Sequence, residues 1–169
     1  YDIYTDGLKV YTTIDSRMQR YAEEAVRRQL SGKLQPLFEA ERRSSPNFPY
    51  SSSLKASDVQ RRIQKAMRQS DRYRLMKAAG ASEEEIEAAF RTKVPMTVFS
   101  WHGEVDTLMT PRDSILYYKK FLRSAMVSID PLTGHVKAYV GGMDFAHFQY
   151  DMAMVGRRQI GSTMKPFVY

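Results

Sequence analysis

The tetrapeptide Ser162-Thr163-Met164-Lys165 has the residue types and the spacing of a nucleophile beside its base. A serine hydroxyl attacks poorly at neutral pH unless a base lies within hydrogen-bond reach. Side chains three positions apart share one face of a helix, and Pro166 favours a helix that starts here. The positive end of the helix dipole opposes a protonated Lys165 and favours negative charge on the Ser162 oxygen. The pattern therefore predicts a nucleophilic Ser162 with Lys165 as general base, and backbone N–H groups available to an oxyanion.

The same spacing has a second interpretation, because a chain of this length holds about one Ser-x-x-Lys match by chance at ordinary residue usage. Ser52-Ser53-Leu54-Lys55 is such a match, and it lies in a serine-rich loop without a helix start. A serine at the start of a helix can also be a simple cap. The residues around the tetrapeptide have to decide between the two roles.

Elements near both ends of the chain are expected to position this pattern. Alternating residues predict a strand over 8–14, followed by a helix that Asp15 or Ser16 caps and that Ser31-Gly32 ends. Residues 125–130 and 135–140 predict the two strands of a hairpin, because the link between them has proline early and glycine late.

The residues between these parts predict a mainly helical region. Pro95 is expected to break the helical pattern before a strand begins. The predicted elements are a loop over 44–53, a basic helix that Gly80 ends, a short helix with a Ser82–Glu85 capping box, a strand over 96–101 and a helix over about 111–122.

The charge of the chain is uneven. It has 26 Lys and Arg against 19 Asp and Glu, a net charge of +7, and the whole excess lies in residues 1–80, with 16 basic and 9 acidic side chains. A basic half can bind nucleic acid or an anionic membrane, but interspersed Asp58 and Asp71 favour a solvated helix face. We therefore predict no nucleic-acid partner. A nucleic acid would have to contact Arg61, Arg62, Lys65, Arg68, Arg72 and Arg74.

Composition also limits the other function classes. An apolar content of 43% is enough for a packed core, and no apolar run approaches the roughly 20 residues that cross a bilayer. The chain has no cysteine, and His102, His135 and His147 lack the spacing that zinc sites favour. We predict no metal, no cofactor, no transmembrane helix and no signal peptide. Because the chain starts at Tyr1, we expect it to come from a longer protein.

Two separated stretches resemble one known family. The run from Ala125 to Gly142 and the run Arg158–Tyr169, which contains the tetrapeptide, resemble the opening of the transpeptidase domain of class A penicillin-binding proteins. The run Gly7–Asp15, followed by Gln19 and the Ala-Glu-Glu-Ala-Val of 22–26, resembles the segment that links the glycosyltransferase of these cell-wall synthases to that domain. Residues 31–94 match no motif of the family.

The resemblance implies an α+β fold, with a helical linker region in 1–122 and the start of a transpeptidase domain in 123–169. This second part would hold the first β-hairpin and the nucleophile helix of a β-lactamase-like serine transpeptidase domain, incomplete here. Ser162 would be acylated by the D-Ala-D-Ala stem peptide of peptidoglycan and by β-lactams, and Lys165 would accept its proton. The parent protein would act at the periplasmic face of the bacterial inner membrane, held by an anchor absent from this chain.

The chain departs from the family pattern in several places. Ile160 stands where proline is usual, Met164 where phenylalanine is usual, and Asp151-Met152-Ala153 replaces Asn-Arg-Ala, which puts a polar role of that loop in doubt. The Ser-x-Asn and Lys-Thr-Gly motifs expected after the nucleophile are missing; Ser45-Pro46-Asn47 matches the first only by coincidence. We therefore expect the fragment alone to be inactive, and 125–169 to be loosely packed or self-associated.

A second function class stays open. Residues 1–122 can be a non-catalytic linker or interaction module that docks partner proteins. Glu104 and Asp106 are weaker candidates for paired catalytic carboxylates, since both can simply face solvent. Trp101, Tyr117 and Tyr118 are interpreted as core or groove aromatics.

Overall fold

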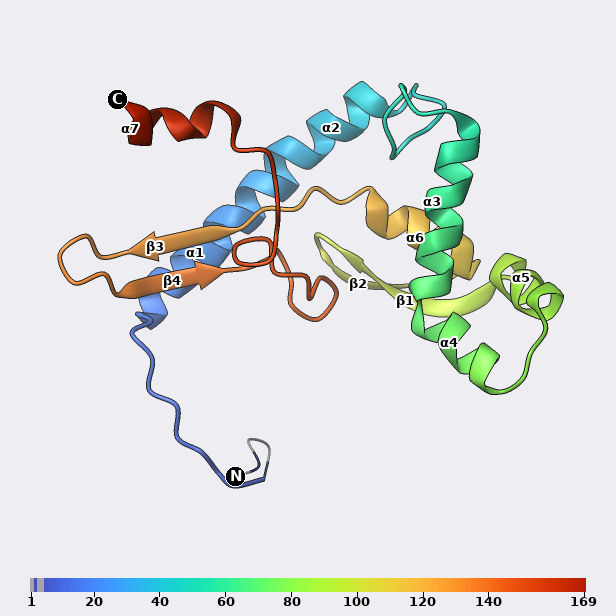
Figure 1. Cartoon of the computed structure of the whole chain (residues 1–169), viewed down its shortest axis with the longest axis horizontal. Helices are drawn as coiled ribbons and strands as arrows, with labels where there is room; N and C mark the ends of the chain where they lie inside the picture. The colour runs from blue at the N-terminus through green and yellow to red at the C-terminus, as the bar shows by residue number, and fades with distance from the viewer. Residues whose placement is uncertain (1, 3–4) are drawn as a thin grey trace. The chain divides into compact units, whose positions relative to one another are not determined.

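The computed structural model describes residue 2 and residues 5–169, which form two compact units. The terminal unit combines the residues up to Arg28 with Arg123–Tyr169, and the middle unit comprises Gln29–Leu122. Each unit holds helices and one two-stranded antiparallel sheet, so the fold is mixed α+β (Figure 1). Leu122 is the last residue of the middle unit, whereas Thr13, Asp15 and the helix after them, which sequence analysis assigned to the linker region, pack with the C-terminal part.

The terminal unit contains α1 (Ser16–Gln29), β3 (Met126–Ile129) and β4 (Val136–Val140), so the predicted helix and hairpin are confirmed. Asp15 caps α1, because its carboxylate accepts the backbone N–H groups of Arg17 and Met18. In the hairpin, the pairing becomes irregular at the Ser128–Ile129 step. The buried apolar residues of α1 and β4 are Ala22, Val26, Ala138 and Val140. The unit ends with a 3-10 turn (Gly161–Met164) and α7 (Lys165–Val168).

The strand predicted over 8–14 is wrong. This segment has no regular secondary structure, and the side chains of Val10 and Tyr11 are 81% and 90% exposed. Only its end reaches β4, where the Thr13 hydroxyl donates to the Val136 carbonyl at 2.7 Å and the Asp15 N–H donates to the Lys137 carbonyl at 2.9 Å. The chain then turns into α1, which leaves no extended backbone to continue a ladder along the edge of β4.

The helix end predicted at Ser31-Gly32 is also wrong. From α1 the backbone continues through a π-helical stretch, Leu30–Leu34, directly into α2 (Gln35–Arg42). Leu30 and Gln35 are both 3% exposed. Burial of both residues favours the helical continuation over a break at a single serine and glycine, whose intrinsic cost is only about 1 kcal/mol.

The remaining elements of the middle unit confirm the predicted helical region with three differences. Ser70 breaks the basic helix in two and caps the second half by accepting the Tyr73 N–H. Pro95 lies inside the first strand instead of ending the pattern, and a second strand that was not predicted pairs with it. Proline is tolerated there because the strand has a neighbour on one side only. The elements are α3 (Ala56–Gln69), α4 (Asp71–Ala78), α5 (Glu83–Arg91), β1 (Val94–Ser100), β2 (Gly103–Met109) and α6 (Pro111–Lys119).

The core of the middle unit lies between α3 and α5. Ile63 and Met67 of α3 meet Ile86 and Phe90 of α5, and all four side chains are at most 5% exposed. The predicted capping box is confirmed at the start of α5, where Ser82 and Glu85 exchange side chain–backbone hydrogen bonds. These contacts give the unit a hydrophobic core of its own.

We expect Gln35→Ala to lower the free energy of unfolding of the middle unit by about 1–3 kcal/mol. The buried Gln35 amide donates to the Lys120 carbonyl at 3.0 Å and accepts the Leu122 N–H at 2.9 Å, so its loss leaves backbone groups unpaired. Chemical denaturation followed by the fluorescence of Trp101, the single tryptophan of the chain, measures the change. Gln64→Ala, on the exposed surface of α3, is the matched control. Equal stability of the two variants would contradict the bridging role of Gln35.

Candidate active site

The predicted nucleophile and base lie in two consecutive helical turns. Ser162 is in the 3-10 turn and Lys165 opens α7, where its N–H donates to the Ser162 carbonyl. Gly161 enters the turn with a φ of +55°, in the left-handed region that favours glycine. Pro166 lies in the first turn of α7, as predicted. The whole stretch Gly161–Tyr169 is exposed.

The helix-cap interpretation of Ser162 is wrong. Neither helical turn receives a side-chain cap, and within residues 2 and 5–169 the Ser162 hydroxyl makes no hydrogen bond. Its neighbour Thr163 behaves differently, because its hydroxyl donates to the Ile160 carbonyl at 2.6 Å. The Ser162 hydroxyl thus makes no hydrogen bond with Lys165 either, so the predicted contact between nucleophile and base is not formed in this structure, whereas the Thr163 oxygen is engaged with its own backbone.

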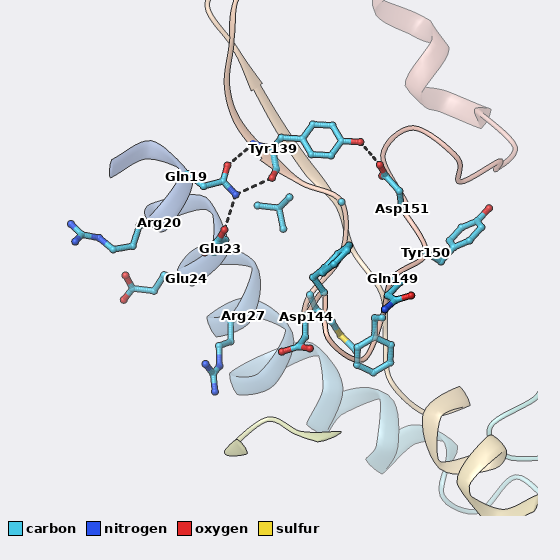
Figure 2. A pocket seen from close by; sticks show the side chains of 16 residues that line it. Gln19, Arg20, Glu23, Glu24, Arg27, Tyr139, Asp144, Gln149, Tyr150 and Asp151 are labelled. Carbon is cyan, nitrogen blue, oxygen red and sulfur yellow. Dashed lines mark hydrogen bonds between the residues drawn. The ribbon is translucent and has the colours of Figure 1, made fainter. Parts of the chain in front are cut away.

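A polar groove lies next to the sheet in the terminal unit, between α1 and the loop that follows β4 (Figure 2). It encloses about 740 Å³. Gln19 of α1 connects the helix to β4. Its side-chain amide donates to the Tyr139 carbonyl at 2.9 Å and accepts the Tyr139 N–H at 2.7 Å. The Gln19 side chain thus pairs with the backbone N–H and carbonyl of Tyr139 on the outer edge of β4, as a neighbouring strand would. Ser162 and Lys165 do not line the groove.

The loop wall of the groove is fixed to β4 by Asp151. Its Oδ2 accepts the Tyr139 hydroxyl at 2.5 Å, and its Oδ1 accepts the N–H groups of Ala153 and Met154 at 2.8 and 3.1 Å (Figure 2). The departure from asparagine had put a polar role of this loop in doubt. In the structure the carboxylate accepts three hydrogen bonds. Sequence reasoning missed the one from Tyr139, which lies twelve positions earlier in the chain.

The Tyr139–Asp151 contact predicts an unusual titration. Donation to the carboxylate raises the pKa of Tyr139 to about 12, and the same hydrogen bond lowers the pKa of Asp151. The stabilisation from the lowered carboxyl pKa is therefore present above about pH 4 and lost as the pH falls through that lowered value. The stabilisation from the raised phenol pKa is present below about pH 10 and lost as the pH rises towards about 12.

An absorbance titration of the phenolates tests this pair. The titration curves of the native chain and of Tyr139→Phe should differ by one phenol that ionises near pH 12. In Asp151→Ala, the ionisation of Tyr139 should return to about pH 10. A difference step near pH 10 in the native chain would show that the hydrogen bond does not form in solution.

The other candidate residues have ordinary structural roles. Asp106 lies in β2, not in a turn, and accepts the Thr97 hydroxyl across the hairpin at 2.7 Å. Glu104 is exposed on the same strand. Tyr117 and Tyr118 exchange hydrogen bonds with the backbone of Phe99, which supports their interpretation as packing aromatics.

The histidines and the basic helices supply no second site. His147 contacts Asp144 at 2.9 Å, and across residues 2 and 5–169 no group of three or more potential metal ligands converges. On α3 and α4, Arg61 and Arg74 form ion pairs with the acidic residues three positions before them. These pairs offset part of the positive charge of the two helices. In the described part of the chain, no helix combines the length and the apolar character needed to span a bilayer.

Comparison with known protein families finds a match in the middle of the chain. Residues 45–122, all within the middle unit, match the penicillin-binding protein middle domain family. This match covers most of the region in which sequence reasoning found no family motif, because the signal is spread over the domain and not held in a short motif. No solved structure matches the chain.

The matched relatives are penicillin-binding proteins 1A. Identity is 28% with the protein of Neisseria flavescens, 29% with that of Neisseria gonorrhoeae and 26% with that of Rickettsia bellii, each over 99% of this chain. The chain spans 23–24% of the length of these relatives. It is thus related to penicillin-binding protein 1A over about a quarter of that protein, in the region that includes the middle domain.

Proposed function

We propose that this chain is a segment of a peptidoglycan D,D-transpeptidase, in which Ser162 is the acylated nucleophile and Lys165 its general base. The observation that carries the proposal is the Ser162-x-x-Lys165 spacing in a chain related along 99% of its length to penicillin-binding proteins 1A, and the exposed Ser162 hydroxyl is compatible with it. The α1–hairpin unit beside it is consistent with the start of a transpeptidase domain, as the resemblance implies.

The reaction would proceed in two acyl transfers. Ser162 Oγ attacks the carbonyl carbon between the two D-alanines of the stem peptide while Lys165 takes the hydroxyl proton. Backbone N–H groups stabilise the oxyanion, the C–N bond breaks, and the terminal D-alanine leaves with the proton. An amine of a second stem peptide then attacks the acyl-enzyme and releases Ser162. A β-lactam would acylate the same oxygen by ring opening and remain attached.

The proposal includes the rest of a longer protein. Groups that complete the site, Ser-x-Asn and Lys-Thr-Gly, would lie after Tyr169, and a glycosyltransferase with its membrane anchor would precede the chain. Such a protein would act at the periplasmic face of the inner membrane, where peptidoglycan is assembled. Without the later groups the 169-residue chain would not cross-link peptidoglycan, and the open edge of β3 would favour self-association.

A fluorescent penicillin tests the proposal. We expect covalent labelling of the full-length protein. The 169-residue chain should be labelled far more slowly or not at all. Labelling of the short chain at the full-length rate would contradict the need for later groups. Absence of labelling from the full-length protein would contradict the enzymatic proposal.

The second candidate is an interaction module that docks partner proteins. It is favoured by the middle unit, which has its own core and matches a named middle domain that excludes Ser162. If docking is the function of the chain, variants of the middle-unit surface would abolish function in cells while penicillin labelling stays unchanged. Loss of labelling with Ser162→Ala would favour the transpeptidase instead.

A further inference from the structure

Asp151 fixes the segment before Ser162 through both its side chain and its backbone. Its carboxylate binds the Tyr139 hydroxyl of β4, and its carbonyl accepts the N–H groups of Val155 and Gly156 at 3.2 and 3.1 Å. The Met152 N–H adds a hydrogen bond of 2.7 Å to the carbonyl of Gly141 at the end of β4. Residues 151–156 therefore form a compact turn that is fastened to the strand.

The close fit at Gly141 shows that this contact is built into the strand end. A Cβ at Gly141 would lie 2.9 Å from Asp151 Oδ1 and 3.3 Å from the Tyr139 ring. Because these distances are shorter than ordinary carbon contacts, any side chain at Gly141 would push Asp151 away from Tyr139. The absence of a side chain at Gly141 thus leaves the space in which Asp151 approaches Tyr139.

We propose that Tyr139 and Asp151 are positioning residues that fix the start of the connection carrying Ser162. This inference rests on the proposed function of Ser162. The four residues from Arg157 to Ile160 are exposed. The last residue before Ser162 that is fixed by the turn is therefore Gly156, six positions earlier. Without the Asp151 carboxylate, the last hydrogen bond to the strand end is the one that the Met152 N–H donates to the Gly141 carbonyl, ten residues before Ser162.

Tether length sets how often the nucleophile meets the groups that complete its site. The effective concentration of a tethered group falls roughly as the −3/2 power of tether length. Lengthening the tether from six to ten residues thus lowers the encounter frequency by about twofold. The same factor is the expected loss of acylation rate, since the penicillin still reaches the same serine.

The test is the acylation rate of the full-length protein with a fluorescent penicillin. We expect Tyr139→Phe and Asp151→Ala each to lower the maximal rate by about twofold, with the half-saturating penicillin concentration unchanged. The double variant should lose no more than either single variant, because both break one contact. Asp151→Asn should restore the rate, since its amide can accept the turn N–H groups and donate to Tyr139.

Two further measurements separate the outcomes. Tyr11→Phe, at a tyrosine that is 90% exposed, is the matched control and should keep the native rate. In the 169-residue chain, hydrogen exchange at the Ala153 and Met154 amides should accelerate in Tyr139→Phe and Asp151→Ala but not in the control. Native rates in both variants, additive losses in the double variant, or unchanged exchange would overturn the positioning role. Labelling that persists in Ser162→Ala would instead overturn the proposed function.

Discussion

Replacing Ser162 by alanine is expected to abolish covalent labelling of the full-length protein by a penicillin, with a loss of at least about a thousandfold in rate. The substitution removes the oxygen that would form the ester, and no other group can take its place in a covalent step. The hydroxyl is exposed and makes no hydrogen bond within residues 2 and 5–169, so its removal should leave the stability of the folded chain unchanged.

Thr163→Ala is the matched control for this experiment. It also removes a hydroxyl from the same turn, but one that donates to the Ile160 carbonyl instead of facing solvent unbonded. We expect Thr163→Ala to retain labelling within about tenfold of the native rate. If Thr163→Ala abolished labelling and Ser162→Ala did not, the nucleophile would have been assigned to the wrong residue.

Phe90→Ala is expected to lower the free energy of unfolding of the middle unit by about 3–5 kcal/mol. Phe90 is 1% exposed and packs in the cluster with Ile63, Met67 and Ile86, so truncation leaves a cavity between α3 and α5. Because a domain of this size is stable by only about 5–15 kcal/mol, the variant should lose a large share of its stability. Denaturant titration with Trp101 fluorescence measures the loss.

Leu75→Ala provides the control for the core substitution. Leu75 lies on α4 in the same unit but is 71% exposed, so its truncation should change stability by no more than about 0.5 kcal/mol. A similar loss in both variants would mean that the α3–α5 cluster is not the core of the middle unit.

Local signals predicted the elements that depend on neighbouring residues. The Ser82–Glu85 capping box, the cap at Asp15 and the β3–β4 hairpin each follow from residues within a few positions of one another. The tetrapeptide at Ser162 belongs to this class too, because its helical turns need only Gly161 and Pro166.

Features that depend on distant partners were not predictable in the same way. The segment 8–14 alternates as a strand does, yet Gln19 takes the edge of β4 at Tyr139, 120 positions along the chain. The groove beside α1 and the bond between Tyr139 and Asp151 likewise require the hairpin to be placed first. The residue types of a segment indicate its local structural preference, but not which distant residue will contact it.

Mass spectrometry of the penicillin adduct tests the central claim most directly. Trypsin cleaves after Arg158 and leaves the Lys165-Pro166 bond intact, so one peptide that starts at Gln159 holds both Ser162 and Thr163. After treatment of the full-length protein, we predict the mass of one opened β-lactam on this peptide, located by fragmentation at Ser162. An adduct at Thr163 or on another peptide, or an unmodified peptide from fully inhibited protein, would contradict the assignment of Ser162 as the nucleophile.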